Sequence, residues 1–252
     1  MRPTSGDPEA LAQVLGRSHR LVFLGGAGVS TESGIPDFRS STGLYAARRE
    51  FGRAPEEILS ADFFAADPET FFRYYVSAIV HPEAEPNPAH RALAALERRG
   101  VLSALVTQNI DGLHQAAGSR EVLELHGSVL RNHCLVCGRS FTLPEVLGRR
   151  TDAAPVPRCD CGGIIKPDVV LYGETLPDGI MDAAARAVRA ADTLVVGGTS
   201  LSVYPAAGLV QLFRGRDLVL INTAATRADS GADLVVREPI GVALAPFVDD
   251  AG

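Results

Sequence analysis

Short apolar runs alternate along the chain with longer, alanine-rich stretches of helix-forming residues. Leucine, valine and isoleucine dominate the short runs, a pattern typical of a parallel sheet covered by helices on both faces, and it predicts an α/β fold. The strands are expected at residues 21–24, 102–107, 122–125, 193–196, 218–221 and 234–236, and helices at residues 87–100, 181–191 and 205–213. For the first helix, Asn87 is the expected cap, Pro88 the first-turn proline and Gly100 the terminating glycine.

Four of these strands run directly into a polar or glycine-rich segment. The segments are residues 25–28, 108–111, 197–200 and 222–223. Ligands of open parallel sheets bind beyond the carboxyl ends of the strands, so we expect these four segments to line one crevice.

Two regions interrupt the alternation. Residues 41–85 are rich in phenylalanine, tyrosine and helix formers, and residues 131–167 contain all the cysteines of the chain. We expect the first to be a helical module and the second a zinc-binding module of one smaller domain. The large domain would then be discontinuous and consist of residues 1–40, 86–130 and 168–252.

The composition is that of a globular protein. Of the 252 residues, 46% are hydrophobic and 21% are charged, which is enough apolar material for one large core. The formal net charge of −6 gives no electrostatic footprint for nucleic acid or an anionic membrane. The chain also lacks a signal-peptide segment and any run near the ~18 apolar residues of a membrane span. We therefore expect a cytoplasmic protein without nucleic-acid or membrane partners, and nothing in the sequence requires more than a monomer.

The four cysteines form two close pairs separated by a loop: Cys134 with Cys137, and Cys159 with Cys161. A cytosolic chain of this size does not need disulfides, and this spacing suits a tetrahedral metal site better. Four thiolates fill a zinc shell and leave no position for water, so the site would be structural. The alternative is four reduced cysteines without metal, but the segment then has too few apolar residues to order itself.

A glycine turn follows the first predicted strand, and its missing side chains would let backbone N–H groups approach a pyrophosphate. The sequence Gly26-Ala27-Gly28 alone also fits an ordinary tight turn between a strand and a helix. Thr31 stands where the usual dinucleotide fingerprint has its third glycine, and Pro36 stops any helix soon after it starts. A dehydrogenase that transfers hydride therefore fits poorly.

Longer motifs are more specific than this turn. Residues 26–39, with the sequence GAGVSTESGIPDFR, resemble the signature of the sirtuin family of NAD-dependent protein deacylases. Further strings resemble that family's motifs in the same order: TQNIDGLH at 107–114, LHGS at 125–128, VVLYGE at 169–174, then Gly198, Thr199, Ser200 and Asn222. The matches extend from residue 21 to about residue 222, which is most of the chain.

The resemblance implies a Rossmann-like NAD-binding domain and a small domain with a helical part and a zinc part, which matches the two insertions. It assigns Gln108 to the nicotinamide ribose, and Ser30, Ile110 and Asp111 to the nicotinamide pocket. Phe38 and Arg39 would lie on a loop that closes over NAD and excludes water. The full set assigned to NAD is Gly26, Ala27, Gly28, Ser30, Thr31, Asp37, Phe38, Arg39, Gln108, Asn109, Ile110, Asp111, His126, Gly198, Thr199, Ser200, Asn222 and Val242.

Two residues are assigned to catalysis. His126 follows a predicted strand, and because an imidazole can accept a proton near neutral pH, the resemblance makes it the general base. Asn109 is assigned to the reaction centre, although Asn109 and Asp111 also stand where such residues often merely cap the next helix. We expect His114 to be a structural histidine packed under the loop, and Glu32, in a variable position of its motif, to be a solvated side chain.

The implied reaction removes an acyl group from lysine side chains and consumes NAD. The acyl oxygen attacks the ribose C1′ as nicotinamide leaves, and His126 then takes a proton from the ribose hydroxyls. The activated 2′ oxygen attacks the imidate carbon, and water completes the release of free lysine and O-acetyl-ADP-ribose. The zinc takes no part in these bond changes. Two alternatives are a protein ADP-ribosyltransferase and a non-catalytic NAD-binding zinc protein; the second would be expected to lose His126 or Asn109.

The resemblance assigns recognition of an acetylated peptide to a strand that binds it largely through backbone hydrogen bonds. Family members that prefer succinyl- or malonyl-lysine carry a Tyr-x-x-Arg pair, whose side chains share one helix face and grip the distal carboxylate. This chain keeps Tyr75 but has Ala78 at the arginine position, and Arg73 points to another side of the helix. We therefore expect acetyl to be preferred over succinyl. The assigned substrate residues are Tyr75, Val169, Val170, Leu171, Tyr172, Gly173 and Glu174.

The second cysteine pair departs from the family's pattern. Two residues usually separate these cysteines, whereas Asp160 stands alone between Cys159 and Cys161. The adjacent Gly162 and Gly163 would permit a compensating turn.

Overall fold

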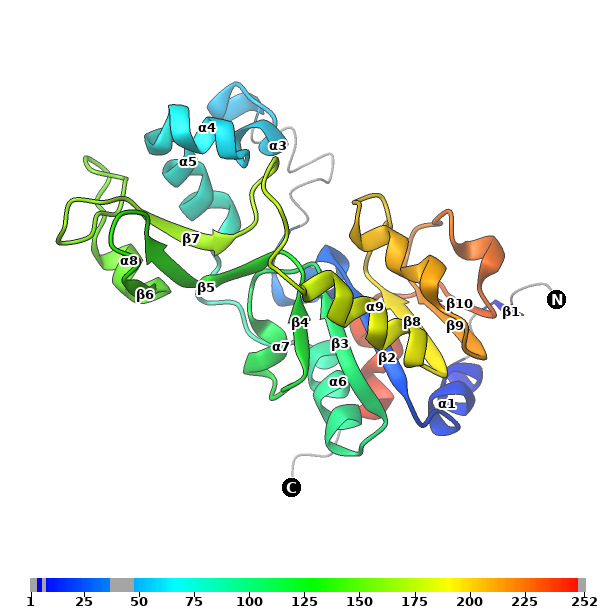
Figure 1. Ribbon diagram of the computed structural model, residues 1–252. Helices are drawn as coiled ribbons and strands as arrows, with labels where there is room; N and C mark the ends of the chain where they lie inside the picture. The colour runs from blue at the N-terminus through cyan, green and yellow to red at the C-terminus, as the bar shows by residue number, and fades with distance from the viewer. Residues whose placement is uncertain (1–3, 6–7, 37–47, 249–252) are drawn as a thin grey trace.

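The computed structural model describes residues 4–5, 8–36 and 48–248 of the chain. A seven-stranded sheet forms its centre, with the strand order β1-β10-β9-β8-β2-β3-β4 (Figure 1). Every strand pairing described in this sheet is parallel, which confirms the predicted α/β class. All six predicted strands are present, and the two-residue β1 is an addition. The strands are β1 (Thr4–Ser5), β2 (Leu21–Gly25), β3 (Leu102–Thr107), β4 (Val122–Glu124), β8 (Thr193–Gly197), β9 (Asp217–Ile221) and β10 (Leu234–Val236).

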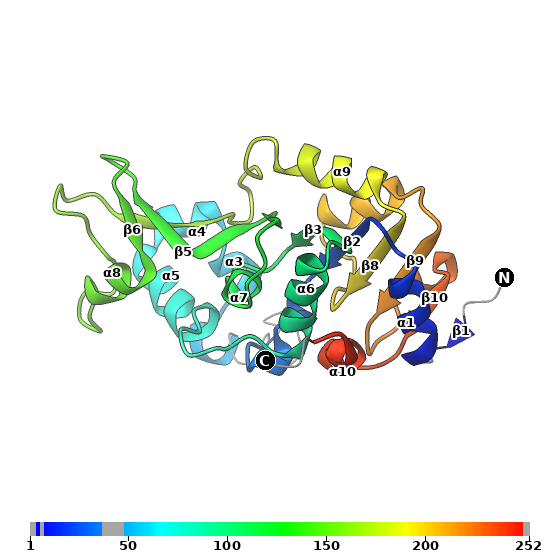
Figure 2. The same ribbon diagram turned by 90° about the horizontal axis from the view of Figure 1, so that it is seen from below.

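Helices cover both faces of this sheet, because successive strand side chains point to opposite faces. Phe23 and Val195 belong to the apolar cluster with α1, α6 and α10, while their neighbours Leu24 and Val196 belong to the cluster with α9 and η4. Figure 2 shows α9 on one side of the sheet and α1 and α10 on the other. The covering elements are α1 (Pro8–Gly16), α6 (Pro88–Arg98), α9 (Ile180–Ala190), α10 (Ile240–Leu244) and the 3-10 helix η4 (Ala206–Leu212).

Two of the three predicted helices have the expected form. The side chain of Asn87 caps α6 by accepting from Ala89 N at 2.9 Å, Pro88 occupies the first turn, and Gly100 follows the helix with φ +73°. The segment predicted as a helix over residues 205–213 is instead the tighter 3-10 form. Gly208 lies inside it, and glycine disfavours a regular α-helix.

A second sheet, which the apolar pattern did not predict, lies in the cysteine-containing region. Its three strands are antiparallel in the order β6-β5-β7, and they are β5 (Gly127–Cys134), β6 (Ser140–Thr142) and β7 (Ile165–Val169). Gly127 pairs with Val169 at one end and Cys134 with Ile165 at the other. Strand β5 therefore runs from the residue after His126 to the first cysteine.

Short helices rich in aromatic residues pack beside this second sheet (Figure 1). Phe71 and Phe72 are fully buried and contact one another edge to face, and the same apolar cluster contains Val169 and Leu171. The elements are α3 (Pro55–Ile58), α4 (Ala61–Ala66), α5 (Pro68–Tyr74) and the π-helical turn η3 (Tyr75–Ile79). Strands β5 and β7 cross the expected boundaries at residues 130/131 and 167/168, and the division into domains stays a prediction.

The remaining described elements are short: η1 (Ala27–Val29), η2 (Thr31–Ser33), α7 (Leu113–Ala116), α8 (Leu143–Gly148), η5 (Asp229–Gly231) and η6 (Ala245–Phe247). Within the described ranges, no helix has both the length and the apolar character needed to cross a membrane.

Candidate active site and metal centre

The loops at the carboxyl ends of the parallel strands meet, as the sequence predicts. Gln108, after β3, donates from its backbone N to Gly25 O at 3.0 Å and from Nε2 to Thr199 Oγ1 at 3.1 Å. Asn222, after β9, donates from Nδ2 to Thr199 O at 3.0 Å. Four separate chain segments are thereby hydrogen-bonded at one edge of the sheet.

The glycines of the first turn have a structural role that the sequence did not reveal. Gly26 N donates to Gly197 O at 3.2 Å, and Gly28 N donates to Gly198 O at 2.8 Å. A Cβ on Gly28 would lie 2.7 Å from Gly198 Cα, so only glycine permits this approach. The missing side chains therefore let two glycine turns pack together, and these two N–H groups are already used within the protein.

The buried side chain of Ser30 joins two polar residues that follow β3, Asn109 and Asp111. Ser30 Oγ donates to Asp111 Oδ2 at 2.7 Å and accepts from Asn109 Nδ2 at 3.0 Å. Asp111 Oδ1 also accepts from Leu113 N at 2.9 Å, at the start of α7. Asp111 therefore also binds the backbone at the start of α7, whose N-cap residue is Gly112, while its second oxygen fixes Ser30.

His126 lies just before β5 and is half-buried. Its Nδ1 is 2.9 Å from Gln108 O. A carbonyl oxygen only accepts hydrogen bonds, so Nδ1 carries the hydrogen and the lone pair of the neutral ring is on Nε2. This arrangement fixes the tautomer in which Nε2 can accept a proton.

One cavity of about 590 Å³ brings the predicted catalytic, nicotinamide and substrate residues together. Tyr75 and Ala78 line it from the π-helical turn, whereas Arg73 donates from Nη2 to Asp152 O at 3.0 Å and does not line it. Its predicted lining residues are Ala27, Ser30, Gln108, Asn109, Ile110, Asp111, His126, Tyr75, Val169, Val170, Leu171, Tyr172, Gly173 and Glu174.

Other residues assigned to NAD lie outside the lining of this cavity. Val242 is 55% exposed on α10, and Thr31 is exposed beside the glycine turn. The others are Gly26, Gly28, Gly198, Thr199, Ser200 and Asn222, all in the joined strand-end loops. Asp37, Phe38 and Arg39 lie outside the described residues.

The predicted substrate segment is held at both ends by backbone hydrogen bonds. Val170 N donates to His126 O at 3.0 Å, while Tyr172 N donates to Leu59 O at 3.0 Å and Tyr172 O accepts from Ala61 N at 2.9 Å. The segment is therefore held between His126 and the helical module, along one wall of the cavity.

Lys166 does not line the cavity but supports the segment that does, and it was not predicted from the sequence. Its side chain is only 12% exposed, and Nζ donates to Val169 O at 3.0 Å and to Glu174 Oε2 at 3.1 Å. Glu174 Oε2 also accepts from Leu171 N at 2.8 Å, so this predicted substrate residue binds the segment's own backbone. The sequence offered one signal for Lys166, which is a lysine among the apolar residues around β7.

Several residues that line the cavity were not predicted from the sequence. Leu59 and Ile79 come from the helical module, and Val203 and Tyr204 come from the loop after β8. Tyr204 is 71% exposed, and Tyr172 is also exposed. No single-sequence pattern distinguishes such residues from ordinary core or loop positions.

His114 and Glu32 have surroundings close to those expected. The His114 ring is buried 4.7 Å from the His90 ring and 6.4 Å from the Phe23 ring, centroid to centroid, and burial keeps its pKa well below the usual value. Glu32 is exposed, but it is not merely solvated, because its Oε2 accepts from Gly241 N at 2.6 Å. That contact joins the turn after β2 to α10.

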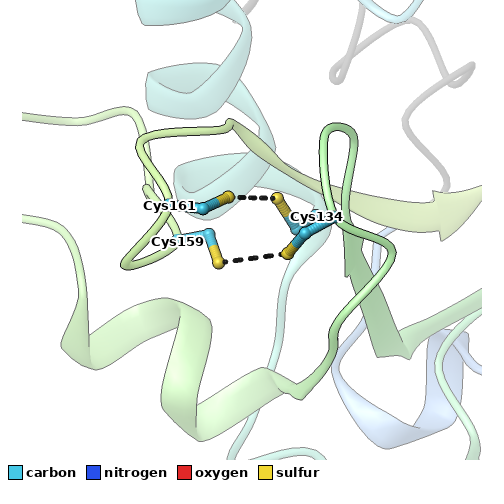
Figure 3. Close-up of side chains that lie close together, drawn as sticks. Cys134, Cys159 and Cys161 are labelled. Carbon is cyan, nitrogen blue, oxygen red and sulfur yellow. Dashed lines mark hydrogen bonds between the residues drawn. The ribbon is translucent and has the colours of Figure 1, made fainter.

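The four cysteine sulfurs form a compact cluster that suits zinc. All four Sγ atoms lie within 4.8 Å of one another; Cys134 is 3.5 Å from Cys161, and Cys137 is 3.7 Å from Cys159 (Figure 3). A tetrahedral site with Zn–S bonds of about 2.3 Å places its sulfurs about 3.8 Å apart.

A backbone N–H of Cys137 lowers the pKa of the Cys134 thiol, and with other groups brings it to about 6. This favours the thiolate of Cys134. A backbone N–H of Gly163 lowers the pKa of Cys161, but the other three cysteines raise it to about 12, so the remaining thiolates would need the positive charge of a metal.

The shortened cysteine spacing is accommodated by a glycine turn. Cys159 N donates to Gly163 O at 2.8 Å, and Gly162 has φ +86°. A Cβ on Gly163 would lie 2.6 Å from Cys134 Sγ, so this residue must be glycine for the two cysteine loops to approach. Asp160 accepts from Arg139 and from Arg149, each at 2.7 Å, and so points away from the sulfurs.

Comparisons with known proteins agree with the sirtuin resemblance. A model of the Sir2 family matches residues 26–205. An NAD-dependent protein deacetylase of Clostridium acetobutylicum is 53% identical over 235 residues, which cover 93% of this chain and 95% of that protein. A solved Sir2 homologue in complex with NAD has a TM-score of 0.85 at 40% identity, covering 98% of this chain and 95% of that one. Sir2 with a p53 peptide and NAD+ has a TM-score of 0.85 at 36% identity, covering 96% and 97%. The chain therefore belongs to the Sir2 family.

Proposed function

We propose that this chain is an NAD-dependent protein-lysine deacetylase that yields free lysine, nicotinamide and O-acetyl-ADP-ribose. The observation that carries this proposal is the single cavity lined by His126, by Asn109 and Asp111, and by the segment after β7. Bound NAD would supply the ADP-ribose that accepts the acetyl group and the nicotinamide that leaves. The relatives named as NAD-dependent protein deacetylases support the same activity.

In this proposal His126 is the general base. Its Nδ1–H bond to Gln108 O holds the ring with Nε2 as the basic atom, and the ring lines the cavity. Nε2 would take a proton from a ribose hydroxyl after nicotinamide has left. Gln108 would then have two roles: its carbonyl orients the base, and its side chain contacts the nicotinamide ribose.

The nicotinamide end of the site would be formed by Ser30, Ile110 and Asp111, with Asn109 beside the reacting carbon. The hydrogen bonds from Ser30 to Asp111 and from Asn109 to Ser30 give these side chains fixed positions before any ligand binds. Preorganised polar groups of this kind lower the cost of reaching the transition state.

The acetylated peptide would lie along residues 169–174, with its acetyl-lysine directed toward Tyr75 and Ala78. Zinc held by Cys134, Cys137, Cys159 and Cys161 would have no role in bond changes, because four thiolates leave no open position. It would order the far end of β5 and β7, the strands whose near ends adjoin His126 and the substrate segment.

Product analysis tests this function directly. The chain is incubated with NAD and an acetyl-lysine peptide, and the products are identified by mass spectrometry. Deacetylated peptide together with acetyl-ADP-ribose supports the proposal. Protein that carries ADP-ribose without an acetylated sugar indicates a transferase, and no NAD-dependent product indicates a non-catalytic NAD-binding protein.

We also propose a monomer that acts in the cytoplasm and has no nucleic-acid partner. Reducing conditions there keep four thiols available to a metal, and the net charge of −6 favours no polyanion. Light scattering of the purified protein tests the oligomeric state, and a dimer mass would contradict it.

A further inference from the structure

Ser30 occupies a central position in the proposed nicotinamide pocket. Its side chain is 1% exposed, and its Oγ atom makes both bonds that join Asn109 to Asp111. A shift of this oxygen would therefore move two polar side chains of the pocket together. The contacts that hold the backbone of Ser30 therefore determine the geometry of this site.

Asn87, which precedes α6, holds the chain on both sides of Ser30. Its Nδ2 donates to Val29 O at 2.7 Å and to Ser33 Oγ at 3.0 Å. These contacts bridge 58 and 54 residues of sequence, and Asn87 is 4% exposed. Asn87 is not among the residues that line the cavity, so it can influence the pocket only through its neighbours.

The other atom of the same amide anchors Asn87 to α6. Oδ1 accepts from Ala89 N at 2.9 Å and from His90 N at 3.4 Å, and the backbone N of Asn87 donates to His90 Nδ1 at 3.2 Å. Burial lowers the pKa of His90 to about 4, so its ring stays neutral and Nδ1 remains an acceptor. Helix α6 packs into the apolar cluster under β2 and β3, which makes it a rigid support.

We propose that Asn87 is a positioning residue for the nicotinamide pocket: through Val29 and Ser33, its amide N–H groups hold Ser30 where Ser30 binds Asn109 and Asp111. This inference rests on the proposed deacetylase function. The two atoms of the Asn87 amide have different roles: Oδ1 caps α6, and Nδ2 fixes the positions of the pocket residues.

The substitution Asn87→Asp separates these jobs, because aspartate keeps the capping oxygen and lacks both N–H donors. We expect added nicotinamide to inhibit this variant about tenfold more weakly, and kcat to fall about tenfold, as for the loss of two buried hydrogen bonds. The KM for the acetyl peptide should change little. Asn87→Ser, which also caps helices but adds no charge, should show the same pattern and serves as the second variant should Asn87→Asp fold poorly.

Asp67→Ala is the matched control. Asp67 caps α5 by accepting from Thr70 N at 3.0 Å, and it does not line the cavity. Its loss should lower Tm as an N-cap loss does, yet leave nicotinamide inhibition unchanged. The control thereby measures what a lost cap does without a lost positioning contact.

A double-mutant cycle with Ser30→Ala tests whether Asn87 acts through Ser30. In the Ser30→Ala background, Asn87→Asp should change nicotinamide inhibition less than threefold. An equal effect in both backgrounds, or a lower Tm with unchanged nicotinamide inhibition, overturns the inference while leaving the deacetylase function intact. A wild-type chain that produces no acetyl-ADP-ribose overturns the proposed function and this inference together.

Discussion

The main parallel sheet and the cysteine-containing region are ordered by different means. The sheet has a large apolar cluster on each face, formed by strand side chains that alternate between α1, α6 and α10 on one side and α9 and η4 on the other. The cysteine-containing region has a cluster of only five buried residues, of which Cys134 and Cys159 are two. Burial of apolar surface can stabilise the first region, whereas we expect the second to need a metal to become ordered.

The groups proposed to react therefore lie apart from the region that a metal would order. The proposed reacting groups lie on loops of the region that has its own core, and none of them needs the metal as a partner. The two regions nevertheless share β5 and β7, because Val169 pairs with Gly127 beside His126. Loss of the metal should therefore disturb the wall that holds the substrate rather than the base.

Zinc removal should have the largest effect and tests the comparison most directly. We expect one zinc per chain, and structural zinc sites in small peptides contribute about 10 to 16 kcal/mol of apparent binding free energy. Chelation should abolish hydrogen-exchange protection in β5, β6 and β7 while protection in β2, β3 and β8 persists. Metal analysis and exchange measurements check this, with zinc re-addition as the control. Less than half an equivalent of zinc in fully active protein would show that the cysteines do not hold a required metal.

The substitution His126→Ala should remove the chemistry and spare the fold. General-base loss usually lowers turnover about 10²- to 10⁴-fold, and NAD binding should stay largely intact because the base acts after NAD has docked. Turnover, NAD titration and Tm measure the three parts of this prediction. The exposed His19, far from the cavity, supplies the control His19→Ala. Retention of more than a few per cent of wild-type turnover would contradict the assignment.

Acyl selectivity should reveal how the small domain contributes to the cavity. A succinyl carboxylate beside Tyr75 and Ala78 would meet no lysine or arginine among the described residues that line the cavity. We expect a penalty of about 2 to 5 kcal/mol, so acetyl should be preferred about 30-fold or more in kcat/KM. Matched acetyl and succinyl peptides measure this ratio. Ala78→Arg should raise succinyl activity, whereas Ala78→Met, of similar length but uncharged, should not. A wild-type preference for succinyl would refute the prediction.

The smallest expected effect concerns Lys166, at the junction of the two regions. Lys166→Met removes the donor to Val169 O and Glu174, so the substrate segment should lose its fixed position. We expect kcat/KM for the peptide to fall about tenfold with KM for NAD unchanged, because buried hydrogen bonds to a charged group are worth about 1.5 to 3 kcal/mol. Arg53→Met breaks the exposed Arg53–Glu57 pair and should have little effect. Equal losses in both variants would show that Lys166 has no special role.

The sequence determined six strands of the main sheet and the strand-end loops, and it pointed to many of the residues that line the cavity. Strands buried on both faces are largely apolar, so a run such as residues 193–197, which is buried throughout, is visible without any structure. The polar residues that follow them stand out for the same reason. The cap, proline and terminal glycine around α6 were also legible, because each satisfies a local backbone requirement.

Only the tertiary structure decided which residues, far apart in the sequence, bind the atoms of one side chain. Asn87 looked like a simple helix cap, and only the packing of α6 beneath the turn after β2 places its nitrogen against Val29 and Ser33. Lys166 was not singled out in the sequence and Glu174 was predicted only as a substrate residue, whereas the turn at residues 171–174 brings the two together. Local sequence encodes backbone preferences over a few residues, whereas these contacts depend on where separate elements lie in the fold.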